Sequence, residues 1–189
     1  MKELNVFDFD NTIYDGDSSI DFYLFTLKKN PLLIRYLPIQ LYGMLLYKLN
    51  IKSKEYFKEK YFSFLKGIDN INEEVREFWN ENLKKIKSNL INNKKNIVVI
   101  SASPEFLLEP ICKKIGTERL IATKVDKSTG KFYSKNCYGK EKVERLNKEY
   151  EEYNIKEFYS DSKSDKYLAE ISENSFLINK DRILDWNNS

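Results

Sequence analysis

Apolar runs and helical periodicity alternate along this chain, and the alternation predicts a parallel sheet flanked by helices. The first apolar run, residues 4–9, is rich in Val and Phe and is typical of a buried strand. Further strands are predicted at residues 96–100, 120–125, 132–133, 157–160 and 176–178. Helices are predicted at 104–115, with Pro104 in the first position, and at 140–150 and 164–171. Strands that alternate with helices favour an α/β fold with a parallel sheet.

A block of helical periodicity from about residue 17 to residue 91 interrupts this alternation. Its clearest helix places apolar side chains on one face at Val75, Phe78, Trp79, Leu83, Ile86 and Leu90. Asn72, followed by two glutamates, predicts the start of that helix. Aromatic side chains at residues 56–65 predict another helix. We therefore expect a core domain made of residues 1–16 and 92–189, with residues 17–91 inserted as a helical block.

Composition narrows the partners that the chain is expected to bind. It has 189 residues, of which 41% are hydrophobic, enough for a packed core. The net charge of +3 comes from interspersed charges without a basic stripe, so a nucleic-acid partner is not expected. Cys112 and Cys137 lie outside any CxxC pair and are expected to be reduced thiols of a cytoplasmic protein.

The apolar segment at residues 31–49 is the candidate for membrane contact. Arg35, Pro38 and Gln40 interrupt it, which favours packed helices over a membrane-spanning helix. No signal peptide fits the N-terminus, because the first predicted strand begins almost at once. Contact with a membrane surface is therefore an alternative and not the expectation.

The chain contains no histidine. Its absence excludes Ser-His-Asp and Cys-His nucleophile systems, histidine-ligated zinc and acid–base catalysis by histidine. Proton transfer has to use carboxylates, lysine, tyrosine or water.

Two aspartates end the first apolar run. Side chains alternate along a strand, so Asp8 and Asp10 are expected to project to the same side at its carboxyl end. Two carboxylates in such a place repel each other, and burial penalises their charged forms further. A cation between them or a shared proton relieves this cost. The pair therefore favours a catalytic or metal-binding site.

Three further polar clusters follow predicted strands. Ser101 ends the strand at 96–100, Asp161 and Asp165 follow the strand at 157–160, and Lys142 lies where a turn opens a helix. Each has an ordinary structural explanation, such as a helix cap or a surface lysine. Open α/β sheets, however, place ligands outside the carboxyl ends of their strands. The order of these residues along the chain therefore predicts one shared site.

This order of motifs resembles the haloacid dehalogenase-like (HAD) hydrolase superfamily. The resemblance rests on DFDNT at residues 8–12, a hydroxyl at Ser101, a helix-borne lysine and YSDSKSD at residues 159–165. SASPEFL at 101–107 and NCYGKEKVERL at 136–146 are similar to subfamily IB, the branch related to phosphoserine phosphatase. The segment at 31–49 is similar to the cap of the phosphatidylglycerophosphatase C type. Ser160 departs from the pattern, because many relatives carry glycine before the aspartate.

The resemblance implies a three-layer, Rossmann-like core with a helical cap at residues 17–91, and a Mg²⁺-dependent phosphatase. Asp8 is then the nucleophile that forms a phospho-aspartate, and Asp10 is the general acid and base. Ser101 and Lys142 hold the phosphoryl oxygens, with Lys140 as the alternative lysine.

The remaining site residues also follow from the resemblance. The predicted Mg²⁺ ligands are oxygens of Asp8, Asp10, Asp161 and Asp165, with Asp10 using its backbone carbonyl and Asp165 binding directly or through a bridge. The predicted contacts to the phosphate and the rest of the substrate are Asn11, Thr12, Ala102 and Arg35.

The sequence leaves the substrate and the reaction class open. The expected substrate is a small phosphorylated metabolite, and the apolar segment favours a lipid phosphate as the alternative. The same residues are also compatible with a phosphotransferase or mutase, with a non-catalytic binding module on this scaffold and with a receiver domain. The sequence indicates no oligomeric state.

Overall fold

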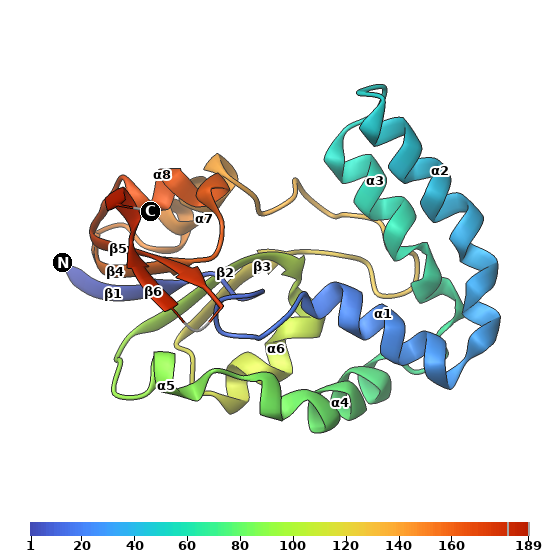
Figure 1. Cartoon of the computed structure of the whole chain (residues 1–189), viewed down its shortest axis with the longest axis horizontal. Coiled ribbons are helices and arrows are strands. Elements are labelled where there is room, and N and C mark those ends of the chain that lie inside the picture. Colours follow the sequence, from blue (N-terminus) through green and yellow to red (C-terminus); the bar gives the residue numbers. More distant parts are fainter. Residues whose placement is uncertain (181, 189) are drawn as a thin grey trace.

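The computed structural model describes residues 1–180 and 182–188, and this part of the chain contains a six-stranded sheet in the order β3-β2-β1-β4-β5-β6 (Figure 1). The strands are β1 (Lys2–Phe7), β2 (Ile97–Pro104), β3 (Arg119–Thr123), β4 (Tyr153–Ser160), β5 (Ser172–Asn179) and β6 (Arg182–Asp185). The first five are parallel, and β6 pairs antiparallel with β5 at the edge. The predicted α/β fold is confirmed.

The helices between β1 and β2 form the long insertion. They are α1 (Ser18–Lys29), η1 (Pro31–Tyr36), α2 (Leu37–Lys48), α3 (Lys54–Tyr61), η2 (Phe62–Gly67), α4 (Ile71–Asn82), η3 (Leu83–Lys85) and α5 (Ser88–Ile91). The later helices are α6 (Glu105–Lys114), α7 (Lys140–Glu149), η4 (Lys163–Asp165), α8 (Lys166–Ala169) and η5 (Trp186–Asn188). In Figure 1, α2 and α3 lie farthest from the sheet, whereas α4 lies beside α6.

The alternation of side chains along the central strands gives the sheet two apolar faces. Val98 and Ile100 of β2 face one cluster, which α7 and α8 cover through Leu146 and Leu168. Val99, between them, faces the opposite cluster, which contains apolar side chains of α4 and α6. The sheet is therefore the middle of three layers.

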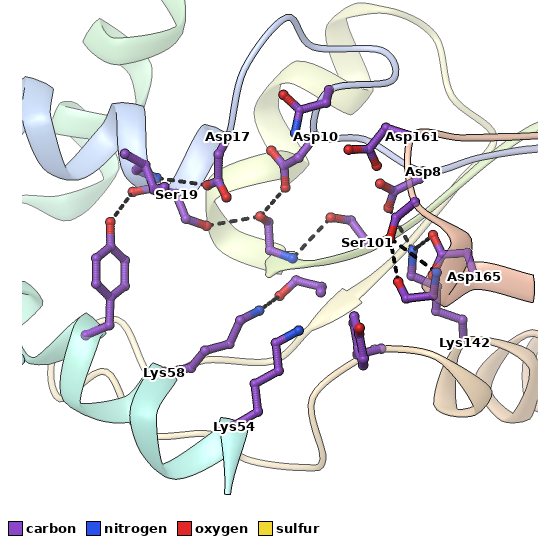
Figure 2. Close-up of a pocket in the computed structure, with 18 of the residues that line it drawn as sticks. Asp8, Asp10, Asp17, Ser19, Lys54, Lys58, Ser101, Lys142, Asp161 and Asp165 are labelled. Atoms are coloured by element: carbon purple, nitrogen blue, oxygen red, sulfur yellow. Dashed lines mark hydrogen bonds and ion pairs between the residues drawn. The ribbon is translucent and has the colours of Figure 1, made fainter. Parts of the chain in front are cut away.

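The central position of β1 determines where a ligand can bind. From β1 the chain crosses to β2 and β3 on one side, and it later returns to β4 and β5 on the other. Loops that leave neighbouring strands in opposite directions open a crevice at their carboxyl ends. A cavity of about 320 Å³ lies there, between these loops and α3 (Figure 2).

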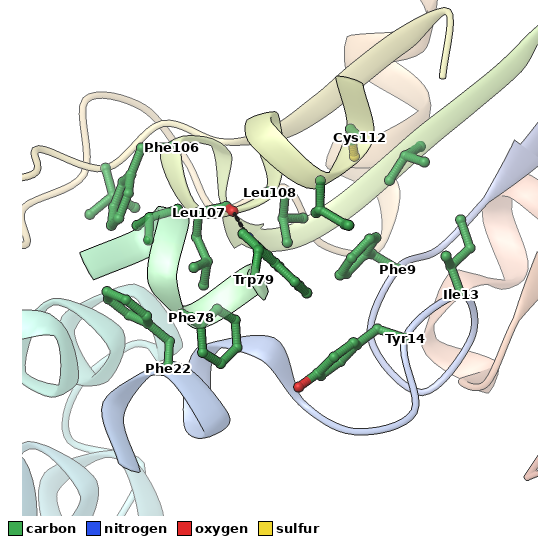
Figure 3. Close-up of a cluster of buried hydrophobic side chains, with 14 of the residues drawn as sticks. Phe9, Ile13, Tyr14, Phe22, Phe78, Trp79, Phe106, Leu107, Leu108 and Cys112 are labelled. Atoms are coloured by element: carbon green, nitrogen blue, oxygen red, sulfur yellow. Dashed lines mark hydrogen bonds between the residues drawn. The ribbon is translucent and has the colours of Figure 1, made fainter. Parts of the chain in front are cut away.

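Trp79 joins the insertion to the core of the protein (Figure 3). Its Nε1 donates a hydrogen bond of 2.6 Å to the backbone carbonyl of Leu107 in α6. Its ring packs edge-on against Phe9 and Tyr14, with ring centroids 5.8 and 5.4 Å apart. The helix α4 thus shares one apolar cluster with the sheet. The predicted domain boundary at residues 17–91 stays a prediction.

The longest predicted helix is shorter than its periodicity indicates. Its N-cap is Asn70 and not Asn72, because the Asn70 side chain accepts the hydrogen bond from the backbone N–H of Glu73. The helix ends at Asn82. Residues 85–87 instead hydrogen-bond through their backbone to residues 13–15, and these bonds replace the helical ones.

Other element boundaries also differ from the prediction. The first strand ends at Phe7, so Asp8 and Asp10 lie in the loop after it. Pro104 is the N-cap of α6 and the last residue of β2. Residues 132–133 form only an isolated bridge, from Phe132 to Val125, and β6 was not predicted.

Helices predicted as continuous are divided in two other places. The aromatic segment at 56–65 changes from α3 to the 3₁₀ turn η2 at Phe62, and the segment at 164–171 is made of η4 and α8. Among the described helices, none combines the length and the apolar character needed to cross a bilayer.

We predict that Trp79→Ala lowers the free energy of unfolding by about 3–5 kcal/mol, because it leaves a cavity and removes the hydrogen bond to α6. Urea denaturation followed by circular dichroism measures the change. The matched control is Glu81→Ala, an exposed position two residues further along α4, which should change stability by less than about 0.5 kcal/mol. Equal effects of the two substitutions would contradict the role given to Trp79.

Candidate functional site

Asp8 lines the cavity beside Asp161, Asp165 and Lys142 (Figure 2). It continues the pairing of β1 with β4, since its backbone N–H donates to the carbonyl of Tyr159 at 2.8 Å. Only 8% of the residue is exposed. Burial raises the pKa of Asp8 to about 7, and the nearby charge of Lys142 opposes this rise. The backbone of the strand therefore holds a carboxylate where its charge is costly.

Lys142 provides the positive charge that this carboxylate requires. Its Nζ lies 2.8 Å from Asp8 Oδ1 and 2.7 Å from Asp165 Oδ2. Although burial acts in the opposite direction, the two carboxylates raise the pKa of Lys142 above its ordinary value, so it stays protonated. Gly139 precedes the helix with φ of +56° and ψ of −127°, a conformation that favours glycine. Lys140, the alternative lysine, is exposed and does not line the cavity.

Asp10 is held by two hydrogen bonds, one from α1 and one from β2. The backbone N–H of Ser18 donates to its Oδ1 at 2.7 Å, and the hydroxyl of Ser103 donates to its Oδ2 at 2.5 Å. Burial, reinforced by the charge of Asp17, raises the pKa of Asp10 to about 6. A carboxyl group with such a pKa can both donate and accept a proton near neutral pH.

Asp161 and Asp165 reach the same cavity from the loop after β4. Burial raises the pKa of Asp161, and a hydrogen bond with the side chain of Asn11 opposes this rise. Asp165 accepts from Lys142 and, at 2.8 Å, from the hydroxyl of Ser160 through Oδ2. Its Oδ1 is buried without a hydrogen-bond partner among the described residues. The serine that departs from the family pattern thus orients an acidic residue of the site.

The other predicted site residues divide into two groups. Asn11, Ser101 and Ala102 line the cavity together with the four aspartates. Thr12 is fully buried and does not line the cavity, and its hydroxyl has no partner among the described residues. Arg35 is exposed in η1 and contacts the hydroxyl of Tyr36, so the fold does not bring it to the cavity.

Sequence reasoning missed several polar side chains that line the cavity. Ser103 bonds to Asp10, and Lys54 and Lys58 reach the cavity from α3. The two lysines are four residues apart on α3, which places them on one face. That spacing is visible in the sequence, but surface lysines at this spacing are common, so the signal carries little weight.

The oxygen atoms around the cavity fit a hard divalent cation. Lys142 is the only described cation within ion-pair distance of Asp8, Asp10, Asp161 or Asp165, so negative charge is in excess. Among the described residues, no three Asp, Glu or Cys side chains are spaced to hold a metal by themselves. The predicted ligand set does not need three side chains that hold the ion by themselves, because one of its ligands is the backbone carbonyl of Asp10. The donor types therefore suit Mg²⁺.

Solved structures with similar folds include proteins from two bacteria. A protein of unknown function from Bordetella pertussis Tohama I has a TM-score of 0.75 and 20% identity, over 93% of this chain and 89% of that one. A phosphoserine phosphohydrolase-like protein from Francisella tularensis has a TM-score of 0.54 and 19% identity, over 93% and 86%. Phosphoserine phosphatase in its apo form has a TM-score of 0.54 and 18% identity, over 93% and 85%. At these identities the likeness establishes the fold.

No curated protein matches the sequence. Residues 6–170 match the family described as haloacid dehalogenase-like hydrolase, and this range contains every residue that lines the cavity. The match covers most of the chain and agrees with the parallel sheet and with the position of the two aspartates after β1. The chain belongs to the haloacid dehalogenase-like hydrolase family.

Proposed function

We propose that this hydrolase is a Mg²⁺-dependent phosphatase that transfers the phosphoryl group of a phosphomonoester to Asp8 and then to water. The observation that carries the proposal is the contact between Lys142 Nζ and Asp8 Oδ1, 2.8 Å apart, beside a second aspartate with a raised pKa. A phosphomonoester repels nucleophiles with its own negative charge, so a site for it has to neutralise charge and align the reacting atoms.

In the first step, a carboxylate oxygen of Asp8 attacks phosphorus, and the bond from phosphorus to the ester oxygen breaks. Lys142 binds Oδ1, and no described residue hydrogen-bonds to Oδ2, which makes Oδ2 the attacking atom. The charge of Lys142 favours the ionised form of Asp8 and opposes the effect of burial. Protonated Asp10 donates its proton to the leaving oxygen, so the product leaves as an alcohol.

In the second step, water attacks phosphorus, and the bond from phosphorus to Asp8 breaks. Asp10, now ionised, accepts a proton from the water, and inorganic phosphate leaves. Ser18 and Ser103 hold Asp10 in one place through both steps. The hydroxyl of Ser101 and the backbone N–H groups near Asn11 and Ala102 are the proposed donors to the phosphoryl oxygens.

Asp8, Asp161 and the backbone carbonyl of Asp10 would hold Mg²⁺, with Asp165 as a direct or bridged ligand. The ion supplies positive charge to the phosphoryl oxygens. Similar structures support this proposal. They include a substrate-bound complex of phosphoserine phosphatase and an analogue of its phospho-aspartyl intermediate, with TM-scores of 0.53 and 0.54.

The proposed substrate is a small phosphorylated metabolite. A lipid phosphate is the second candidate, and one observation favours it. Large apolar side chains are exposed in η1, in α2 and in the turn after α2, at Leu32, Ile34, Ile39, Leu41, Tyr42, Leu45, Tyr47, Leu49 and Ile51. Exposed apolar patches of this kind occur at membrane and partner contacts.

We predict that Asp8→Asn lowers the release of phosphate from 4-nitrophenyl phosphate by at least about 10³-fold, because it removes the nucleophile. The variant should melt no lower than the wild type, since one buried negative charge is lost. Asp15→Asn, an exposed position in the same loop, is the control for activity. Near-normal turnover by Asp8→Asn would rule out the phospho-aspartate.

Removal of divalent ions with EDTA should abolish turnover, and added Mg²⁺ should restore it. We predict that Asp161→Asn raises the Mg²⁺ concentration for half-maximal activity by about 10–100-fold, because a ligand is weakened while the nucleophile stays. Mg²⁺ titration of the initial rate measures this shift. Asp69→Asn, an exposed aspartate in the insertion, should leave the titration unchanged. An unshifted curve for Asp161→Asn would remove this residue from the metal site.

Lys142→Met should destabilise the protein by about 3–5 kcal/mol at pH 8, because Asp8 and Asp165 are then buried without a countercharge. The pKa of Asp8 is higher in the folded protein than in the unfolded chain. The contribution of Asp8 to the free energy of unfolding is therefore fully present below about pH 4, and it is lost as the pH rises through about 7. Loss of Lys142 raises that pKa further, so the deficit should shrink at pH 5. Urea denaturation at both pH values tests this, with Lys140→Met as the exposed control; a deficit that does not depend on pH would contradict it.

A further inference from the structure

Two lysines of the insertion reach the cavity from the side of α3. Lys54 and Lys58 are one helical turn apart, and both line the cavity that contains Asp8 and Lys142 (Figure 2). Lys58 Nζ donates to the carbonyl of Ala102 at 2.8 Å and to Oδ1 of Asn136 at 3.2 Å. Its ammonium group is thus held next to the end of β2 that carries Ser101.

The charges of these two lysines are not neutralised locally. Lys142 contacts two carboxylates, but no carboxylate of the described residues lies within ion-pair distance of Lys54 or Lys58. Lys54 Nζ instead lies 3.5 Å from the centre of the Tyr138 ring. Burial and the neighbouring charge of Lys54 lower the pKa of Lys58 to about 8, although Asp10 and Asp17 oppose this from a greater distance. Two cations gathered in this way repel each other unless an anion binds between them.

The volume of the cavity limits what such an anion belongs to. About 320 Å³ is at the lower end of pockets for small ligands, so the phosphate at Asp8 and an anion at α3 belong to one compact molecule. Ile20, Phe57 and Phe62 line the same cavity and provide apolar contacts for its carbon atoms. The polar groups of the cavity are thus divided between one end at Asp8 and another at α3.

We propose that Lys54 and Lys58 form a second anion subsite, and that the preferred substrate is a phosphomonoester with a further negatively charged group. This inference rests on the proposed phosphatase function. The further group is a carboxylate, a second phosphate or a phosphodiester. A soluble metabolite and a phospholipid headgroup both offer this chemistry.

Two esters with the same three-carbon skeleton test the subsite. Glycerol 3-phosphate has the phosphate alone, and 3-phosphoglycerate adds a carboxylate at the far end. For the wild type, kcat/KM should be at least about tenfold higher for 3-phosphoglycerate, the size of effect expected for charge-assisted hydrogen bonds. The Lys54→Gln/Lys58→Gln double variant should lose this preference, mainly through KM.

Two further variants separate charge from structure. Lys58→Arg keeps the charge and should keep the preference. Lys60→Gln lies on the same helix but outside the cavity, and should leave the ratio of the two kcat/KM values unchanged. If the double variant does not fold, the single variant Lys54→Gln, whose ammonium group lies against the Tyr138 ring, replaces it. An unchanged ratio in the folded variants, or an equal loss for both esters, would overturn the subsite.

Calorimetry separates this inference from the proposed function. Binding of 3-phosphoglycerate to the Asp8→Asn protein should weaken at least about tenfold when both lysines are replaced, and binding of glycerol 3-phosphate should change much less. This result supports the subsite even if the wild type hydrolyses no phosphomonoester, an outcome that would refute the phosphatase alone. Equal binding with and without the lysines would refute the subsite alone.

A third substrate identifies the source of the anion. A dihexanoyl glycerophospholipid whose headgroup has both a phosphodiester and a terminal phosphomonoester is compared with 3-phosphoglycerate. Whichever of the two substrates has the higher kcat/KM with the wild type, the subsite is supported when the double variant loses that advantage. The better substrate then shows whether the second anion belongs to a lipid headgroup or to a soluble metabolite.

Discussion

One buried ammonium group among four aspartates is the constraint on which the arrangement of this protein depends. Lys142 contacts Asp8 and Asp165 directly, while Asp10 and Asp161 line the same cavity. These residues come from the loop after β1, the start of α7 and the loop after β4, so the charge balance exists only when the sheet is complete. Apolar packing on both faces of the sheet offsets the electrostatic cost of burying this cluster. Burial also raises the pKa values of Asp8 and Asp10.

The parts of this arrangement that follow from local pattern could be predicted from the sequence. The strand before Asp8 is a short apolar run, and the polar residues after it were expected at the carboxyl end of a parallel sheet. The alternating strands and helices likewise determine the fold class. The sequence named Lys142 with Lys140 as the alternative, and in the structure only Lys142 of the two lines the cavity, because the Gly139 turn sets the direction of the helix against the sheet.

The parts that depend on contacts between distant segments could not be predicted in this way. The end of α4 at Asn82 is set by backbone hydrogen bonds of residues 85–87 to residues 13–15, which no periodicity indicates. Arg35 was a candidate because it belongs to the inserted block that resembles a substrate-selecting cap, but in the structure it contacts Tyr36 and does not line the cavity. Nothing in the sequence distinguishes Ser103 and Lys58 from other serines and lysines. The fold brings Ser103 to Asp10 and Lys58 to the carbonyl of Ala102, and these contacts place both residues at the site.

The hydrogen bond from Lys58 to the Ala102 carbonyl joins the insertion to the end of β2, across the cavity. A ligand that draws the Lys58 ammonium toward itself has to replace this bond. Ligand occupancy and the separation of α3 from the sheet are therefore thermodynamically linked, and each alters the equilibrium of the other by the same free energy. A stronger bond between Lys58 and Ala102 in the empty protein therefore lowers the apparent affinity for such a ligand.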